Sequence, residues 1–197
     1  MPVMEGKCVL FKEFGNVNAV PICLDTQDTE EIIQAVKNIA PGFGGINLED
    51  ISAPRCFEIE ERLKEMLDIP VFHDDQHGTA IVVLAGIING LRVTGKKKED
   101  CRVVVNGAGS AGVAITKLLL TYGFKHVTMC DREGIIGKDY PNLNWMQKKM
   151  TEVTNLENAS GTLADALRGA DIFVGVSAPN IVTPEMVSSM NKDAILF

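Results

Sequence analysis

The sequence predicts an α/β protein built on a doubly wound parallel sheet, with a smaller α/β unit before it. Residues 40–80 alternate between strand and helix patterns, which is typical of parallel sheets. Further on, the glycine-rich segment 107–112 follows a β-branched strand and opens an apolar helix, the arrangement of a Rossmann-type domain. We therefore expect two domains, an N-terminally incomplete α/β unit over residues 1–76 and a C-terminally incomplete Rossmann domain over 77–197.

The composition is that of an ordinary globular chain and argues against several classes of protein. Of its 197 residues, 46% are hydrophobic and 23% are charged. The net charge of -7 argues against a nucleic-acid binder held by phosphate contacts. No apolar run reaches about 18 residues without a polar interruption, so we expect no membrane-spanning helix. Glu5 and Lys7 interrupt the start, so we also expect no secretory signal.

Cysteine usage bears on the cellular compartment. The five cysteines are odd in number and widely spaced, and no two form a CxxC pair. This pattern fits free thiols in a reducing cytosol better than a disulfide framework or a zinc site. We expect a cytoplasmic protein.

The first half of the chain is read from short apolar runs and helix boundaries. The acids of 28–31 open a helix where the helix dipole favours them, and Pro41 and Gly42 stop it. Pro54 begins the next helix, and Pro70 precedes the next strand. The expected elements are strands over 8–11 and 20–24, a helix over 28–39, a strand over 44–48, a helix over 54–67 and a strand over 71–72.

The second half begins with a helix over 79–91 that is apolar nearly all round, so we expect it to be buried between two layers. Thr183 and Pro184 form a helix start, as cap and first helical residue. A core strand at the end suggests a fragment of something longer. The other expected elements are strands over 101–105, 126–130, 172–174 and 193–197 and helices over 113–122, 145–153 and 163–167.

The glycine motif carries the first functional prediction. Gly107 permits a tight turn, Gly109 lets the backbone approach a pyrophosphate, and Gly112 lets the helix pack closely on the strand. Asp131 lies at the end of the next strand, where a carboxylate can accept hydrogen bonds from ribose hydroxyls, which points towards NAD. The adjacent Arg132 could meet a 2′-phosphate, so NADP stays open. The alternative is a glycine-rich turn that binds nothing. The expected cofactor is NAD or NADP, held by Gly107, Ala108, Gly109, Ser110, Ala111, Gly112, Asp131 and Arg132.

A second group of residues consists of acids placed after two neighbouring strands. Glu49 and Asp50 follow the first strand, and Asp74 and Asp75 follow the second. Carboxylates from adjacent parallel strands can converge on Mg²⁺ or Mn²⁺, which prefer oxygen ligands. The alternative makes these acids helix caps or solvated turn residues.

Four segments of the chain resemble the malic enzymes, in particular the compact bacterial type. Their order and spacing agree over essentially all of the sequence. The most specific is the stretch HDDQHGTA at 73–80. The matching segments are 2–7, 46–51, 72–80 and 107–112.

The resemblance implies oxidative decarboxylation of L-malate to pyruvate and CO₂, with reduction of NAD(P)⁺ and a requirement for Mg²⁺ or Mn²⁺. Carried over by position, Glu49, Asp50 and Asp75 ligate the metal. Lys7 is the general base that takes the C2 hydroxyl proton, and Asp74 assists it. We also expect a homodimer or higher homo-oligomer, with no nucleic acid or membrane as partner.

The chain also departs from the family. Family members carry a tyrosine and a substrate-binding arginine upstream of the lysine motif, and asparagines beyond the position of Phe197. We therefore expect a truncated core with weak or no activity on its own. Two alternatives stay open. One is another two-domain dehydrogenase, such as an amino-acid dehydrogenase, and the other is a catalytically inactive NAD-binding module.

Overall fold

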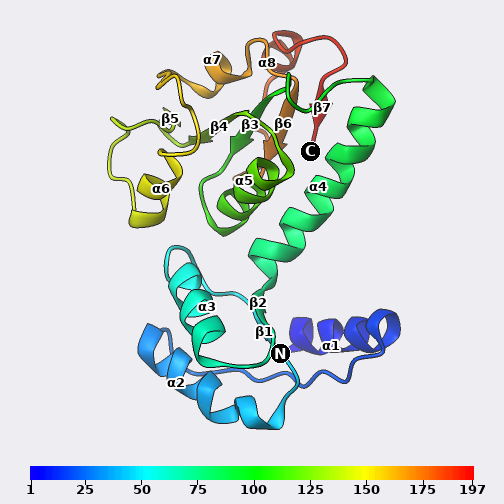
Figure 1. Ribbon diagram of the computed structural model, residues 1–197, viewed down its shortest axis with the longest axis vertical. Coiled ribbons are helices and arrows are strands. Elements are labelled where there is room, and N and C mark those ends of the chain that lie inside the picture. Colours follow the sequence, from blue (N-terminus) through cyan, green and yellow to red (C-terminus); the bar gives the residue numbers. More distant parts are fainter.

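The computed structural model describes residues 1–197 as two units joined by one long helix (Figure 1). In the smaller unit, β1 and β2 pair in parallel, with Ile46 opposite Val71. Side chains of α2 and α3 pack with these strands in one hydrophobic cluster. The elements of this unit are α1 (Pro2–Gly15), α2 (Thr29–Ile39), the 3-10 helix η1 (Ala40–Gly42), β1 (Ile46–Leu48), α3 (Arg55–Met66) and β2 (Val71–His73).

The larger unit is a five-stranded sheet in the order β5-β4-β3-β6-β7. Its strands are parallel except β5, which pairs antiparallel to β4 at the edge. One cluster packs α4 and α5 on one face, and a second packs α7 and α8 on the other, so the predicted α/β class with a mostly parallel sheet is confirmed. The elements are α4 (Asp74–Thr94), β3 (Arg102–Asn106), α5 (Ser110–Tyr122), β4 (His126–Asp131), β5 (Gly134–Ile135), α6 (Trp145–Met150), α7 (Leu163–Leu167), β6 (Ile172–Gly175), α8 (Pro184–Ser188) and β7 (Ile195–Leu196).

The two strands expected near the N-terminus are wrong. Residues 8–11 belong to α1, and residues 20–24 form no strand. A four-residue apolar run does not distinguish a strand from part of a helix. In α1 the run is not buried either, since Val9 and Leu10 are more than half exposed.

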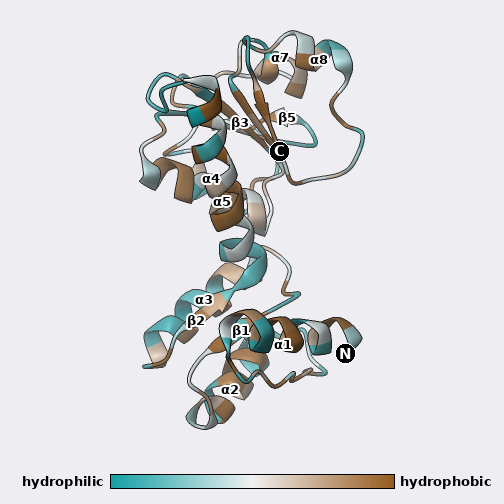
Figure 2. Ribbon diagram, turned by 90° about the vertical axis from the view of Figure 1, so that its right-hand side faces the viewer, coloured by the Kyte–Doolittle hydropathy of each residue, from teal (hydrophilic) through white to brown (hydrophobic).

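The long helix α4 also differs from expectation. It begins at Asp74 rather than Thr79, because the acids stand in its first turn, where the helix dipole favours them. It is not buried between two layers: one side packs on α5 through Ala80 and Ile87, while Ile81 and Val82 are exposed. Figure 2 shows that hydrophobic and hydrophilic residues alternate along α4. By length and composition alone α4 could cross a membrane. Here it connects the two units.

The two units share a hydrophobic cluster. Cys56 and Phe57 of α3 are buried with Ala108 of the glycine-rich loop and with Met146 and Met150 of α6. The Phe57 ring also meets the ring of the next α6 residue, Trp145, edge to face at 6.2 Å between centroids. The position of α3 is therefore fixed against the glycine-rich loop.

Asp171 ties three segments of the larger unit together. Its carboxylate lies 2.8 Å from Lys96 Nζ and accepts hydrogen bonds from the Arg102 backbone N–H and the Asn191 side-chain amide. Burial raises the pKa of Asp171, but these three partners outweigh it and hold the pKa below its usual value of 3.8. A depressed pKa stabilises the fold above the unfolded-state value, and this stabilisation is lost as the pH falls through the folded-state pKa.

Replacing Asp171 by asparagine is expected to lower the free energy of unfolding at pH 7 by about 1–3 kcal/mol, because a charged acceptor with three donors is lost. The difference from wild type narrows as the pH is lowered below 3.8. Urea unfolding over this pH range measures it, with the exposed Asp139→Asn as control. A difference that stays constant or widens toward acid would contradict the assignment.

Candidate active site

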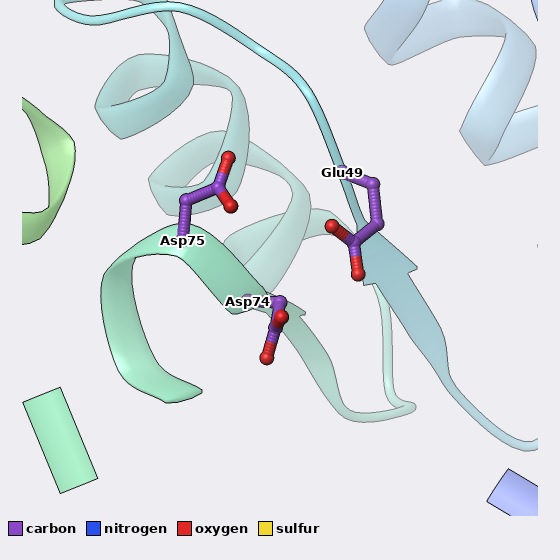
Figure 3. A group of neighbouring side chains, drawn as sticks. All are labelled: Glu49, Asp74 and Asp75. Carbon is purple, nitrogen blue, oxygen red and sulfur yellow. The ribbon is translucent and has the colours of Figure 1, made fainter. Parts of the chain in front are cut away.

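Three carboxylates converge where the small sheet meets the start of α4. Glu49 follows β1 directly, and Asp74 and Asp75 occupy the first turn of α4 (Figure 3). One oxygen of each lies within 4.8 Å of the others, so the three could hold a metal ion. Parallel pairing of β1 with β2 brings these acids together, since both strands end at the same edge.

Lys7 of α1 lies against this group. Its Nζ is 2.5 Å from Glu49 Oε2 and 3.4 Å from Asp74 Oδ2. Burial lowers the pKa of Lys7, but the hydrogen bond and charge of Glu49, followed by those of Asp74, outweigh it and raise the pKa. Without another cation at the acids, Lys7 is therefore an ammonium group.

The donor set fits a hard divalent cation. All three grouped side chains offer carboxylate oxygens, which Mg²⁺ and Mn²⁺ prefer. Asn47 Oδ1, next to the group, is buried without a hydrogen-bond partner, although Asn47 donates its Nδ2 hydrogen to Glu49 Oε1. Asp50 lies outside the group of three, with an exposed side chain and a left-handed backbone at φ 56°.

The glycine-rich loop joins β3 to α5. Gly107 has φ +120°, in the region that favours glycine, and its N–H donates to the Cys130 carbonyl of β4. A Cβ on Gly112 would lie 1.7 Å from the Gly107 carbonyl oxygen, so only glycine allows this helix start so close to the strand. Gly109 has no heavy atom within 4 Å of where its Cβ would be.

The start of α5 can bind an anion. Its N-cap is Gly109, which has no side chain to cap the first N–H groups. Ser110, Ala111 and Gly112 follow as the first three helical residues. Free N–H groups and the positive end of the helix dipole at this position suit a phosphate group.

Asp131 stands at the end of β4 beside this loop, with Arg132 exposed next to it. Gln147 of α6, which the sequence did not reveal as a site residue, connects Asp131 to the glycine-rich loop. Its Nε2 donates to both Asp131 Oδ2 and the Ala108 carbonyl, each at 3.4 Å. Its signal in the sequence was limited to the capping pair Asn144 and Gln147, which marks a helix start but no site.

The two candidate sites face each other. In Figure 1 the strands β6 and β7 run toward the smaller unit, so the carboxyl ends of the parallel strands, and the glycine-rich loop after β3, lie on that side. The helix α4 starts at the acids and runs away along the larger unit (Figure 1). In open α/β sheets, ligands bind outside the carboxyl ends of the strands. Fold and site together define a two-unit α/β protein with a Rossmann-type domain and an acid cluster opposite its glycine-rich loop.

Two family models match almost the whole chain. The malic enzyme N-terminal domain matches residues 1–64, and the malic enzyme NAD-binding domain matches residues 76–194. The chain belongs to the malic enzyme family.

Similar proteins agree with this assignment. The chain is 60% identical to an NAD-dependent malic enzyme of Geobacillus stearothermophilus, over 100% of the chain and 41% of that protein. It is 45% identical to an NADP-dependent malic enzyme of Rhizobium meliloti, over 100% of the chain and 26% of that protein. The crystal structure of the NAD-dependent malic enzyme from Thermotoga maritima superposes with a TM-score of 0.96 at 51% identity, over 99% of the chain and 52% of that structure. The chain thus spans less than half the length of these two curated relatives.

Proposed function

We propose that this chain forms the metal- and dinucleotide-binding core of an enzyme that oxidatively decarboxylates L-malate to pyruvate and CO₂ and reduces NAD⁺ or NADP⁺. Family membership supports the reaction class. The observation that carries the proposal is the convergence of Glu49, Asp74 and Asp75 beside Lys7, opposite a dinucleotide-type glycine loop. The carboxylate group also argues against the alternative of an amino-acid dehydrogenase, because such an enzyme needs no divalent metal.

In this proposal Glu49, Asp50 and Asp75 hold Mg²⁺ or Mn²⁺. The exposed Asp50 side chain has to turn toward the other two for this. A divalent cation supplies positive charge that stabilises the negative charge developing on the substrate oxygen during decarboxylation. The three carboxylates fix the position of the cation and in this way orient the substrate oxygen that it contacts.

Lys7 accepts the proton of the C2 hydroxyl, and Asp74, 3.4 Å from its Nζ, orients the amine. A base must be neutral before it accepts a proton, and the Glu49 contact works against this by raising the pKa of Lys7. The proposal therefore requires the charge of Glu49 to be taken up by a cation when substrate is bound.

The glycine-rich loop and the start of α5 bind the pyrophosphate of NAD⁺ or NADP⁺, which supplies the hydride acceptor. The Asp131 carboxylate accepts hydrogen bonds from the ribose hydroxyls, and the Arg132 guanidinium can pair with a 2′-phosphate. Gly109 leaves open the space through which the backbone and the cofactor approach each other.

Calorimetric titration of Mn²⁺ into the chain, with and without L-malate and NAD⁺, tests the proposal. We expect Mn²⁺ to bind and L-malate to tighten the binding, with D-malate as the matched control. NAD⁺ binding without any Mn²⁺ binding would contradict the proposal and leave a catalytically inactive dinucleotide-binding module. An affinity for Mn²⁺ that does not change when L-malate is added would contradict L-malate as the substrate.

A further inference from the structure

We propose that Glu60 of α3 is a positioning residue for the candidate metal site, an inference that rests on the proposed function. Glu60 carries a charge yet is only 4% exposed. Its Oε1 accepts a hydrogen bond of 3.0 Å from the His73 backbone N–H. The same oxygen lies 3.0 Å from Lys64 Nζ and 2.7 Å from His77 Nε2.

These contacts enclose two of the acids. His73 directly precedes Asp74 and Asp75, and His77 follows them by two residues. Glu60 therefore holds the chain on both sides of the acid pair, at the end of β2 and in the first turns of α4. Moving Glu60 would release the backbone that sets the direction of both carboxylates.

The contact with His73 also replaces a missing cap. His73 is the N-cap of α4 and makes no side-chain cap hydrogen bond. In a capping box, the third helical residue would accept the hydrogen of the N-cap N–H. Here that residue is Gln76, whose Nε2 is buried without a partner. The hydrogen bond from the His73 N–H is accepted instead by Glu60, which lies on a different helix, α3. The start of α4 is thus fixed by α3.

Glu60 does not act as a ligand in this arrangement, because it lies outside the group of carboxylates whose oxygens come within 4.8 Å. Burial raises its pKa, but His77 and Lys64 outweigh this and lower it, so the group stays a carboxylate. A side chain that touches no ion can still set the affinity of a site by orienting its ligands, typically by about 10–100-fold.

The experiment compares three variants of the 197-residue chain by Mn²⁺ and NAD⁺ titration. Glu60→Gln keeps an oxygen for the His73 N–H but loses the charge that meets Lys64 and His77. Glu60→Ala loses both. Glu65→Gln, exposed on the same helix, makes the same change of charge as the first variant and is the control.

We expect the Kd for Mn²⁺ to rise by about tenfold or more in Glu60→Ala and by less in Glu60→Gln. Glu65→Gln should stay within about twofold of wild type, and the Kd for NAD⁺ should stay within about twofold in all variants, on the same scale of effects. This rank order with constant NAD⁺ binding is not what a general loss of structure would give. If Glu60→Ala does not fold, Glu60→Gln decides alone.

Unchanged Mn²⁺ affinity in the folded Glu60 variants would overturn the inference while leaving the proposed function standing. Parallel loss of Mn²⁺ and NAD⁺ binding would also overturn it, since Glu60 would then act on the whole fold. Absence of Mn²⁺ binding in wild type is a different result: it contradicts the proposed function, and this inference with it.

Discussion

Replacing Gly112 by alanine is expected to abolish NAD⁺ binding and to lower the free energy of unfolding by about 3 kcal/mol, at the upper end for an overpacked site. The added Cβ would lie 1.7 Å from the carbonyl oxygen of Gly107 and 2.9 Å from its carbon. Both are backbone atoms, so the clash is relieved only by moving α5 away from β3. That movement dismantles the phosphate-binding turn. Fluorescence titration with NADH and urea unfolding measure the two effects.

Gly109→Ala is the matched control. Its Cβ would meet no heavy atom within 4 Å, so the free energy of unfolding should change little. If the backbone at Gly109 approaches the pyrophosphate, NAD⁺ binding should still weaken. Gly112→Ala with normal stability would contradict the close packing of α5, and Gly109→Ala with normal NAD⁺ affinity would place the cofactor elsewhere.

Replacing Asp75 by asparagine is expected to weaken Mn²⁺ binding by more than the roughly 10–100-fold that residues orienting a ligand contribute. The change removes a negative charge from a group of three carboxylates while keeping the shape of the side chain. Loss of the charge from the first turn of α4 costs only about 0.3–1 kcal/mol of helix stability. Mn²⁺ affinity should therefore fall without loss of the fold.

Asp68→Asn, exposed in the same unit, is the control for the change in charge. NAD⁺ binding should be intact in both variants. Equal losses of Mn²⁺ and NAD⁺ binding in Asp75→Asn would indicate misfolding rather than a lost ligand.

Asp50→Asn adds a separate test: weakened Mn²⁺ binding is expected if the Asp50 side chain turns to the ion, as the family resemblance implies.

Much of the larger unit followed from sequence because its signals are local. The strand of β-branched residues before the glycine-rich loop lies within one residue of its predicted bounds. The helix after it ends at Tyr122 as predicted, but it begins at Ser110, three residues earlier than expected. Thr183 caps α8 as predicted and accepts a hydrogen bond from the Met186 backbone N–H. The predicted start of α2 is also confirmed, although Asp28 is its N-cap and not part of its first turn. Such signals depend on neighbours along the chain and need no tertiary contact.

The errors came where the local signal was ambiguous. The stretch from His73 to Thr79 is polar, so it resembled a turn, whereas its acids and glutamine form the first turn of α4. The apolar residues after it predicted burial on both sides, but α4 meets the larger unit along one side only. Hydrophobicity alone does not report how many layers surround a helix.

The supporting residues of the site were missed for another reason. Glu60 bonds to a residue 13 positions away, and Gln147 bonds to residues 16 and 39 positions away. Only the folded chain brings these partners together. The sequence does not single out Glu60, because it is one of three consecutive charged residues, 60–62, between Ile59 and Leu63. Only the structure shows that Glu60 is the buried one of the three.

The helix α3 has a consequence beyond its packing. Cys56, buried against the glycine-rich loop, and Glu60, which holds the start of α4, are four residues apart, which is about 6 Å along a helix axis. About one turn of α3 thus separates the residue that packs on the glycine-rich loop from the residue that fixes the start of α4. The distance between the carboxylate group and the glycine-rich loop is therefore set by one rigid piece of backbone, so it is a property of the fold and does not depend on a bound ligand.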